Sequence, residues 1–163
     1  YKTYNFPSII TNCSNNYGPR QYPEKLIPLT IHKILKNEKI PIFGDGKNVR
    51  NWLFVEDHID AIILIALKGS LGKKYCIGGM KDITNLSLVK EICKKVDTKT
   101  EREQKSEELI YFVKDRLGHD FRYSISTEML KKELGWNAKT NLEVGLEKTI
   151  DWYLRNKNWL KNI

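Results

Sequence analysis

Hydrophobic residues recur at helical spacing in five segments of the chain, and residues that favour helix ends stand beside several of them. The expected helices span residues 26–35, 57–67, 86–96, 126–134 and 142–154. Asp57 and Ser126 are predicted N-caps, because a short side-chain oxygen can accept a hydrogen bond from a free backbone N–H at a helix start. Gly135 occupies the C′ position, which favours a left-handed residue. The second helix carries an apolar stripe made of Ile59, Ile62, Ile63, Ala66 and Leu67.

Short apolar runs between these segments predict β-strands. The expected strands span residues 6–11, 40–43, 49–55, 74–77 and 109–113. The second and third of them flank a glycine-containing turn, which predicts a hairpin. The remaining expectations are the end of a helix at residues 1–4, a loop rich in turn formers at residues 12–19 and a charged, exposed stretch at residues 101–108. Because strands and helices alternate, the predicted class is α/β.

Length and composition are those of a folded domain. The 163 residues are 40% hydrophobic and 29% charged, and they contain no repeat, low-complexity tract or Gly/Ser linker. We therefore expect residues 1–163 to form one unit. The chain has no apolar run as long as a bilayer span, and Cys13, Cys76 and Cys93 form no CxxC pair. We also expect no secretory leader, because the first residues show no charged-then-apolar pattern. These features predict a cytoplasmic protein without membrane association, a disulfide framework or a metal site.

A net charge of +8 makes nucleic-acid binding one candidate function. A nucleic-acid binder concentrates Lys and Arg on one face, whereas the lysines here are spread over the predicted helices among Asp and Glu. The sequence also contains no recognised nucleic-acid-binding module. We therefore expect no nucleic-acid partner.

Three loops near predicted strand ends carry side chains suited to a nucleoside diphosphate sugar. They contribute Asn15, Asn16 and Lys25, then Arg50, then residues 115–119. Guanidinium and ammonium groups bind diphosphate, and amides both donate to and accept from sugar hydroxyls. Each group also has a plainer interpretation, as turn asparagines, solvated surface cations or a local ion pair. The residues alone therefore indicate an α/β domain with a candidate anionic-ligand site.

A series of short motifs stands in order along the whole chain. They are residues 11–19 (TNCSNNYGP), 22–28 (YPEKLIP), 41–46 (PIFGDG), 50–58 (RNWLFVEDH), 75–79 (YCIGG), 115–120 (DRLGHD) and 133–136 (ELGW). In content, order and spacing the series resembles the dTDP-glucose 4,6-dehydratase family, which belongs to the extended short-chain dehydrogenase/reductase and NAD-dependent epimerase/dehydratase superfamily. The NCSNN and DRxGH elements are the narrower markers, because NYGP and LGW elements occur across the superfamily.

The resemblance implies roles for the matching positions. Asn15 would contact the sugar or diphosphate, and Asn16 would lie toward the nicotinamide end of NAD. The other implied substrate contacts are Lys25 and Leu26 along the diphosphate, Pro41, Ile42 and Phe43 against thymine, Arg50 on phosphate, Asn85 on the nucleotide, and Asp115, Arg116, Leu117, Gly118 and His119 over the ribose and phosphates. No catalytic or metal-binding residue of this chain is implied.

The chain also departs from the family's pattern. Phe43 stands where relatives usually carry Tyr, and Leu117 stands where they usually carry Pro, which alters the nucleotide contacts. The family's Tyr-x-x-x-Lys pair, Thr-Asp-Glu trio and glycine-rich GxGxxG loop are absent, and the first residue is Tyr rather than Met. The resemblance therefore implies the C-terminal part of a Rossmann-type extended short-chain dehydrogenase with its smaller α/β substrate-binding domain, without the N-terminal NAD-binding half.

The implied parent is an NAD-dependent hydro-lyase that converts dTDP-glucose to dTDP-4-keto-6-deoxyglucose for deoxysugar biosynthesis. We expect it to be a homodimer at full length, and we expect the 163-residue piece to be inactive alone. Two alternatives stay open. One is a UDP- or GDP-sugar dehydratase, epimerase or decarboxylase of the same superfamily, and the other is a non-catalytic nucleotide-sugar-binding module.

Overall fold

The computed structural model describes residues 1–159, which form helices and short strands in alternation. The helices are α1 (Leu26–Leu35), α2 (Val55–Lys68), α3 (Asn85–Thr100), α4 (Glu128–Leu134), α5 (Leu142–Arg155) and the 3-10 helix η1 (Ser106–Leu109). The strands are β1 (Ile10–Cys13), β2 (Asn15–Tyr17), β3 (Ile40–Phe43), β4 (Val49–Phe54), β5 (Lys74–Ile77), β6 (Asp82–Thr84), β7 (Ile110–Val113) and β8 (Arg122–Tyr123). All five helices expected from hydrophobic spacing are confirmed.

The strands belong to three small sheets. β1 pairs with β5 and β3 pairs with β7, both in parallel, while β4 pairs in parallel with β2 and β8 and antiparallel with β6. The predicted hairpin of residues 40–43 and 49–55 is therefore wrong. β3 pairs with the distant β7 because its buried Ile40 and Ile42 join the hydrophobic cluster beneath α1 and α3. The predicted loop at residues 12–19 contains β2, and residues 1–4 form a turn rather than a helix end.

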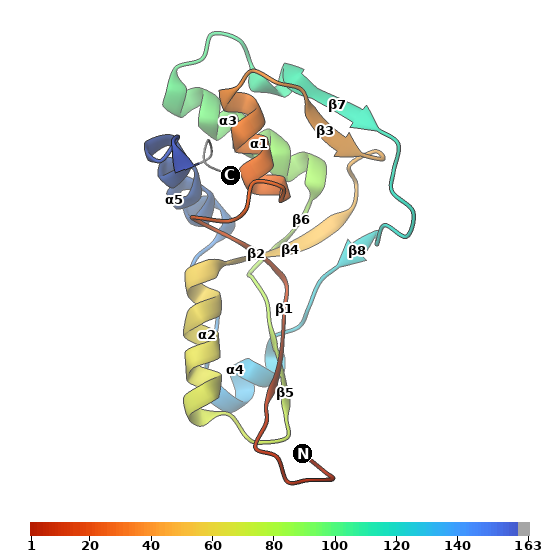
Figure 1. Ribbon diagram of the computed structural model, residues 1–163, viewed down its shortest axis with the longest axis vertical. Helices are drawn as coiled ribbons and strands as arrows, with labels where there is room; N and C mark the ends of the chain where they lie inside the picture. The colour runs from red at the N-terminus through yellow and green to blue at the C-terminus, as the bar shows by residue number, and fades with distance from the viewer. Residues whose placement is uncertain (160–163) are drawn as a thin grey trace.

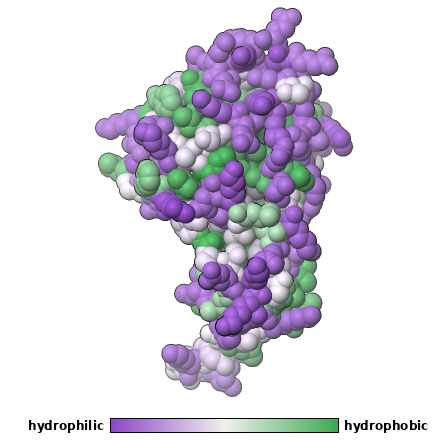
Figure 2. Space-filling model, turned by 180° about the vertical axis from the view of Figure 1, so that it is seen from behind, coloured by the Kyte–Doolittle hydropathy of each residue, from purple (hydrophilic) through white to green (hydrophobic). Residues whose placement is uncertain are grey.

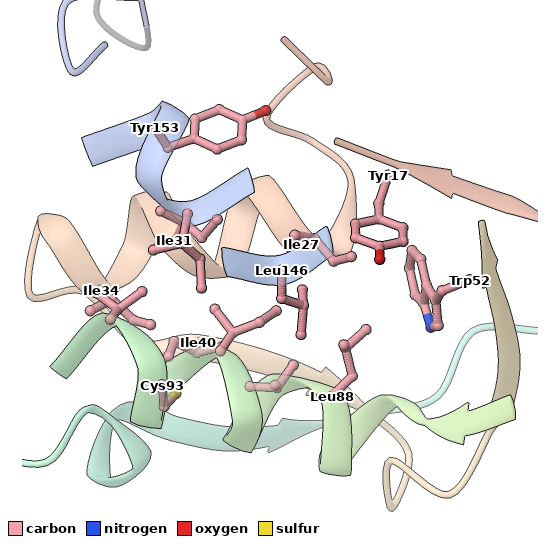
Figure 3. Packing of buried hydrophobic residues seen from close by; sticks show 14 of the residues in the cluster. Tyr17, Ile27, Ile31, Ile34, Ile40, Trp52, Leu88, Cys93, Leu146 and Tyr153 are labelled. Atoms are coloured by element: carbon pink, nitrogen blue, oxygen red, sulfur yellow. The ribbon is translucent and has the colours of Figure 1, made fainter. Parts of the chain in front are cut away.

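The molecule is elongated, with α1, α3, α5, β3 and β7 at one end and α2, α4, β1 and β5 at the other (Figure 1). Each end has its own hydrophobic cluster. The larger one contains Ile31, Leu146 and Tyr153, which converge between the helices in Figure 3. β4 contributes to both clusters, because successive side chains of a strand point to opposite faces. Trp52 enters the larger cluster and Leu53 the smaller one.

One of the two predicted helix caps is wrong. α2 begins at Val55, so Asp57 lies inside its first turn, where it is buried. The Asp57 carboxylate accepts hydrogen bonds from the backbone N–H groups of Lys139 (3.1 Å) and Thr140 (2.8 Å), and it thereby ties α2 to the segment before α5. At the start of α4, the Ser126 hydroxyl accepts a hydrogen bond from the backbone N–H of Glu128 at 3.4 Å, as the predicted cap requires. Thr127, which immediately precedes the helix, makes no side-chain capping bond. Gly135 ends α4 in the left-handed conformation, as predicted.

The apolar stripe of α2 faces outward. The buried residues of this helix are Asp57, Ala61 and Ile65, which follow one another at a spacing of four. All members of the stripe are exposed in this chain. Seen from behind, hydrophilic side chains cover most of the surface, with apolar patches among them (Figure 2). No helix within residues 1–159 is both long enough and apolar enough to cross a membrane.

Candidate functional site

A cleft of about 520 Å³ gathers most of the predicted ligand-binding residues. It lies among β2, β3, β4, the starts of α1 and α3, and the loop that follows β7. Its lining residues are Asn15, Asn16, Gln21, Glu24, Lys25, Leu26, Leu29, Pro41, Ile42, Phe43, Arg50, Trp52, Asn85, Arg116 and His119. Of the predicted site residues, only Asp115, Leu117 and Gly118 are absent from this lining.

The sheet around β4 places side chains from distant segments next to one another. In the parallel pairing of β2 with β4, Asn15 lies opposite Trp52. Arg50 stands two residues before Trp52, so the two side chains project from the same face of β4. Lys25 immediately precedes α1, and Asn85 is the first residue of α3. The cleft therefore depends on pairings between segments that are remote in the sequence.

Two guanidinium groups face the cleft. Arg50 is only 7% exposed, and its terminal nitrogens donate to the backbone carbonyls of Val49 and Asp120, each at 2.7 Å. Burial and the nearby charge of Arg116 lower the pKa of Arg50 from its usual value. Within residues 1–159, neither arginine forms an ion pair with a carboxylate. An anion bound here would neutralise two positive charges that the described residues leave unpaired.

The other predicted cation is partly neutralised. Lys25 forms an ion pair with Glu24 at 2.7 Å, and both side chains are 60% exposed. An exposed pair of this kind is weak and easily rearranged. Lys25 therefore remains available to an anionic ligand at the mouth of the cleft.

The loop after β7 is organised by Asp115. Its carboxylate accepts a hydrogen bond from the backbone N–H of Arg116 (2.9 Å) and lies 2.7 Å from Nδ1 of His119. The His119 side chain is 4% exposed, so the ring is held in place at the cleft wall. Leu117 is 99% exposed, and Gly118 adopts a left-handed φ of 68° with open space around it. Direct ligand contacts by Asp115, Leu117 and Gly118 stay predictions.

Several buried polar atoms of the cleft have no hydrogen-bond partner within the described chain. They are Asn16 Oδ1, Gln21 Oε1, Trp52 Nε1 and Asn85 Oδ1. A buried polar atom without a partner costs free energy, so such atoms are typical of sites that a ligand or water completes. For Asn16 the orientation is defined, because its Nδ2 donates to the Ser14 carbonyl oxygen and to Cys13 Sγ, each at 3.2 Å.

β3 forms one apolar side of the cleft. Ile42 is buried, Pro41 is half-buried and Phe43 is 47% exposed at the rim. Such a surface suits a flat ring. Across residues 1–159, no group of His, Cys, Asp and Glu is arranged to hold a metal ion.

Four lining residues are missed by the sequence reasoning. They are Gln21, Glu24, Leu29 and Trp52. Glu24 stands beside Lys25 in the motif of residues 22–28, and Gln21 immediately precedes that motif. Trp52 follows Arg50 at the two-residue spacing of one strand face. That spacing is the signal that could have identified Trp52.

Solved structures define the class of this fold. A dTDP-glucose 4,6-dehydratase from Bacillus anthracis in complex with NAD superposes with a TM-score of 0.90 at 46% identity, over 99% of this chain and 49% of that chain. A dTDP-glucose 4,6-dehydratase from Streptomyces venezuelae, solved with NAD and a second ligand bound, gives 0.89 at 37% identity, over 99% and 48%. The α/β fold is therefore that of Rossmann-type extended short-chain dehydrogenases, as the sequence predicts.

The family follows from the sequence comparison. The family model described as GDP-mannose 4,6 dehydratase matches residues 1–149, and the chain belongs to this family. A dTDP-glucose 4,6-dehydratase from Shigella flexneri is 44% identical over 162 residues, which is 99% of this chain and 45% of that protein. The predicted resemblance to dTDP-glucose 4,6-dehydratases is confirmed. The chain spans about half the length of the curated relatives it matches.

Proposed function

We propose that the protein containing this chain is an NAD-dependent hydro-lyase that converts dTDP-glucose to dTDP-4-keto-6-deoxyglucose. In this proposal, the chain supplies most of the residues that bind the substrate. The observation that carries the proposal is the cleft in which two arginines adjoin an apolar wall and amide oxygens. Among residues 1–159, these arginines have no carboxylate partner and these amide oxygens have no hydrogen-bond donor. A nucleoside diphosphate sugar needs these three kinds of surface together. Relatives with the same printed activity at 44–47% identity support it.

The roles of the residues follow from their chemistry. Arg50 and Arg116 bind the diphosphate, with Lys25 at the mouth of the cleft. Pro41, Ile42 and Phe43 pack against the base, while Asn15 and Asn85 hydrogen-bond the sugar and nucleotide. Arg50 is prepared for this task, because its two carbonyl partners fix the guanidinium before a ligand arrives.

Bound NAD would supply the hydride acceptor and donor that the conversion of the hexose requires. Asn16 fits a role beside NAD, because its buried Oδ1 has no donor among the residues that the structure describes. The 163 residues contain no GxGxxG loop, so we propose that the chain forms one unit that combines the last Rossmann elements with the substrate domain. We also propose a homodimeric full-length protein, and the three free cysteines support a cytoplasmic one.

The test is a binding and turnover assay on the full-length protein. We expect dTDP to compete with dTDP-glucose far better than UDP or GDP does, and we expect the 4-keto-6-deoxy product to accumulate. The description of the matching family model favours one alternative, a GDP-sugar dehydratase. Preferential competition by GDP, with turnover of GDP-mannose, would replace the proposal by that alternative.

The isolated 163-residue chain gives a second test. The proposal places the catalytic residues outside this chain. We therefore expect the isolated chain to bind dTDP but to form no 4-keto product. Formation of the 4-keto product by the purified 163-residue chain would contradict the placement of the catalytic residues outside it.

A further inference from the structure

Gln21 is a cleft residue to which the family resemblance assigns no role. Its Nε2 donates to the backbone carbonyl of Asn16 at 2.7 Å, which fixes the side-chain amide beside β2. With the nitrogen committed, the amide presents Oε1, which is buried and has no partner within residues 1–159. Gln21 is a lining residue of the cleft, and Oε1 is a fixed acceptor that the described residues leave without a donor.

Trp52, another lining residue of the cleft, carries a buried donor. Its side chain is 7% exposed, and its ring packs edge-on against Tyr17 with the ring centroids 6.3 Å apart. Figure 3 shows the indole nitrogen at the end of the ring turned away from Tyr17. This N–H is buried and has no acceptor in the described chain. An indole nitrogen can only donate, so it needs an acceptor from a ligand or a water molecule.

The cleft is thus polar in two different ways. Around Arg50 and Arg116 the guanidinium groups offer only donors, which suits phosphate oxygens. Near Asn15 and Asn16, where Trp52 pairs across the sheet and Gln21 bonds the backbone, donors and acceptors are mixed. An acceptor oxygen of the protein repels a phosphate. A ligand hydroxyl, by contrast, can donate to that oxygen and can also accept from an N–H. Arg50 and Trp52 are roughly 7 Å apart along β4 at the usual rise per residue.

We propose that Gln21 and Trp52 form a hydroxyl-binding subsite that makes the cleft prefer a nucleotide with its sugar over the bare nucleoside diphosphate. The inference rests on the proposed function, because it assumes that a nucleotide sugar occupies the cleft. Both residues contact the sugar directly and determine specificity, and neither takes part in the chemistry.

The experiment compares two ligands by calorimetry on the full-length protein. The variants are Gln21→Met and Trp52→Phe, each of which removes polar atoms and keeps most of the side-chain volume. Each is expected to weaken dTDP-glucose binding about 3- to 10-fold, the usual effect of one neutral hydrogen bond, while dTDP binding stays within about twofold. Matched controls are Trp136→Phe, a buried tryptophan in the other cluster, and Gln104→Met on the surface.

The outcomes separate the subsite from the proposed function. A wild-type protein that binds neither ligand overturns the proposed function. Wild-type binding of both ligands, with variants that lose neither or lose both equally, overturns only the subsite. If Trp52→Phe fails to fold because its ring belongs to the core, the Gln21→Met variant decides the question, since Gln21 lies outside both hydrophobic clusters.

Discussion

Replacing Arg116 by alanine in the full-length protein should weaken nucleotide binding without destabilising the fold. The side chain is exposed at the cleft, and within residues 1–159 the guanidinium forms no ion pair or hydrogen bond. The one recorded bond of this residue is from its backbone N–H to Asp115, which alanine retains. The guanidinium is therefore free to bind a ligand and adds little to the free energy of unfolding.

The magnitude follows from the kind of bond that is lost. A hydrogen bond to a charged group contributes about 1.5–3 kcal/mol, so Kd for dTDP should rise roughly 10- to 150-fold. Arg50 makes an instructive contrast, because it is buried and bonded to two carbonyls. Arg50→Ala should lower both affinity and Tm, since it leaves those carbonyls without their donor.

The assay is isothermal titration of dTDP into both proteins, with Tm measured in parallel. The control is Arg155→Ala, which removes the same charge from the end of α5, outside the cleft lining. A folded Arg116→Ala protein whose Kd stays within twofold of wild type would refute the placement of Arg116. An equal rise of Kd in the control would show a general charge effect instead.

Three further outcomes are expected. Gly145→Ala should lower the free energy of unfolding by about 1–3 kcal/mol in urea titrations, because the added Cβ would overlap the Tyr17 hydroxyl. If adding Tyr17→Phe to the Gly145→Ala protein restores no stability, this cause is contradicted. Asp115→Ala should raise Kd for dTDP about fivefold, because it frees the loop that the Asp115 carboxylate holds. The control is Asp60→Ala, which removes an exposed carboxylate outside the cleft lining; equal affinities of wild type and Asp115→Ala would refute an organising role. Burial raises the pKa of Cys93 to about 12, so its thiol stays protonated at pH 8 and should resist iodoacetamide until the protein is denatured. Rapid labelling of Cys93 in the native protein, measured by mass spectrometry, would disprove this resistance.

Local sequence patterns were sufficient for the helices and for the residues that carry the motifs. Hydrophobic spacing predicts α1, α3 and α5, because a helix buries one face and its neighbours along that face lie three or four residues apart. Gly135 is predictable for a similar reason, since the left-handed end of a helix is a property of one residue. The motifs likewise identify Arg50, Arg116 and most other residues of the cleft.

Strand pairing and the final shape of the site were decided by tertiary structure. β3 pairs with β7 rather than with the adjacent β4, and Asp57 bonds Thr140 instead of capping its own helix. The polar atoms of Gln21 and Trp52 become significant only because folding buries them without a partner in the described part of the chain. The physical reason is the same in each case. Burial and hydrogen-bond satisfaction depend on segments that are remote in the sequence, so a local pattern reveals which residues are present but not which groups they meet.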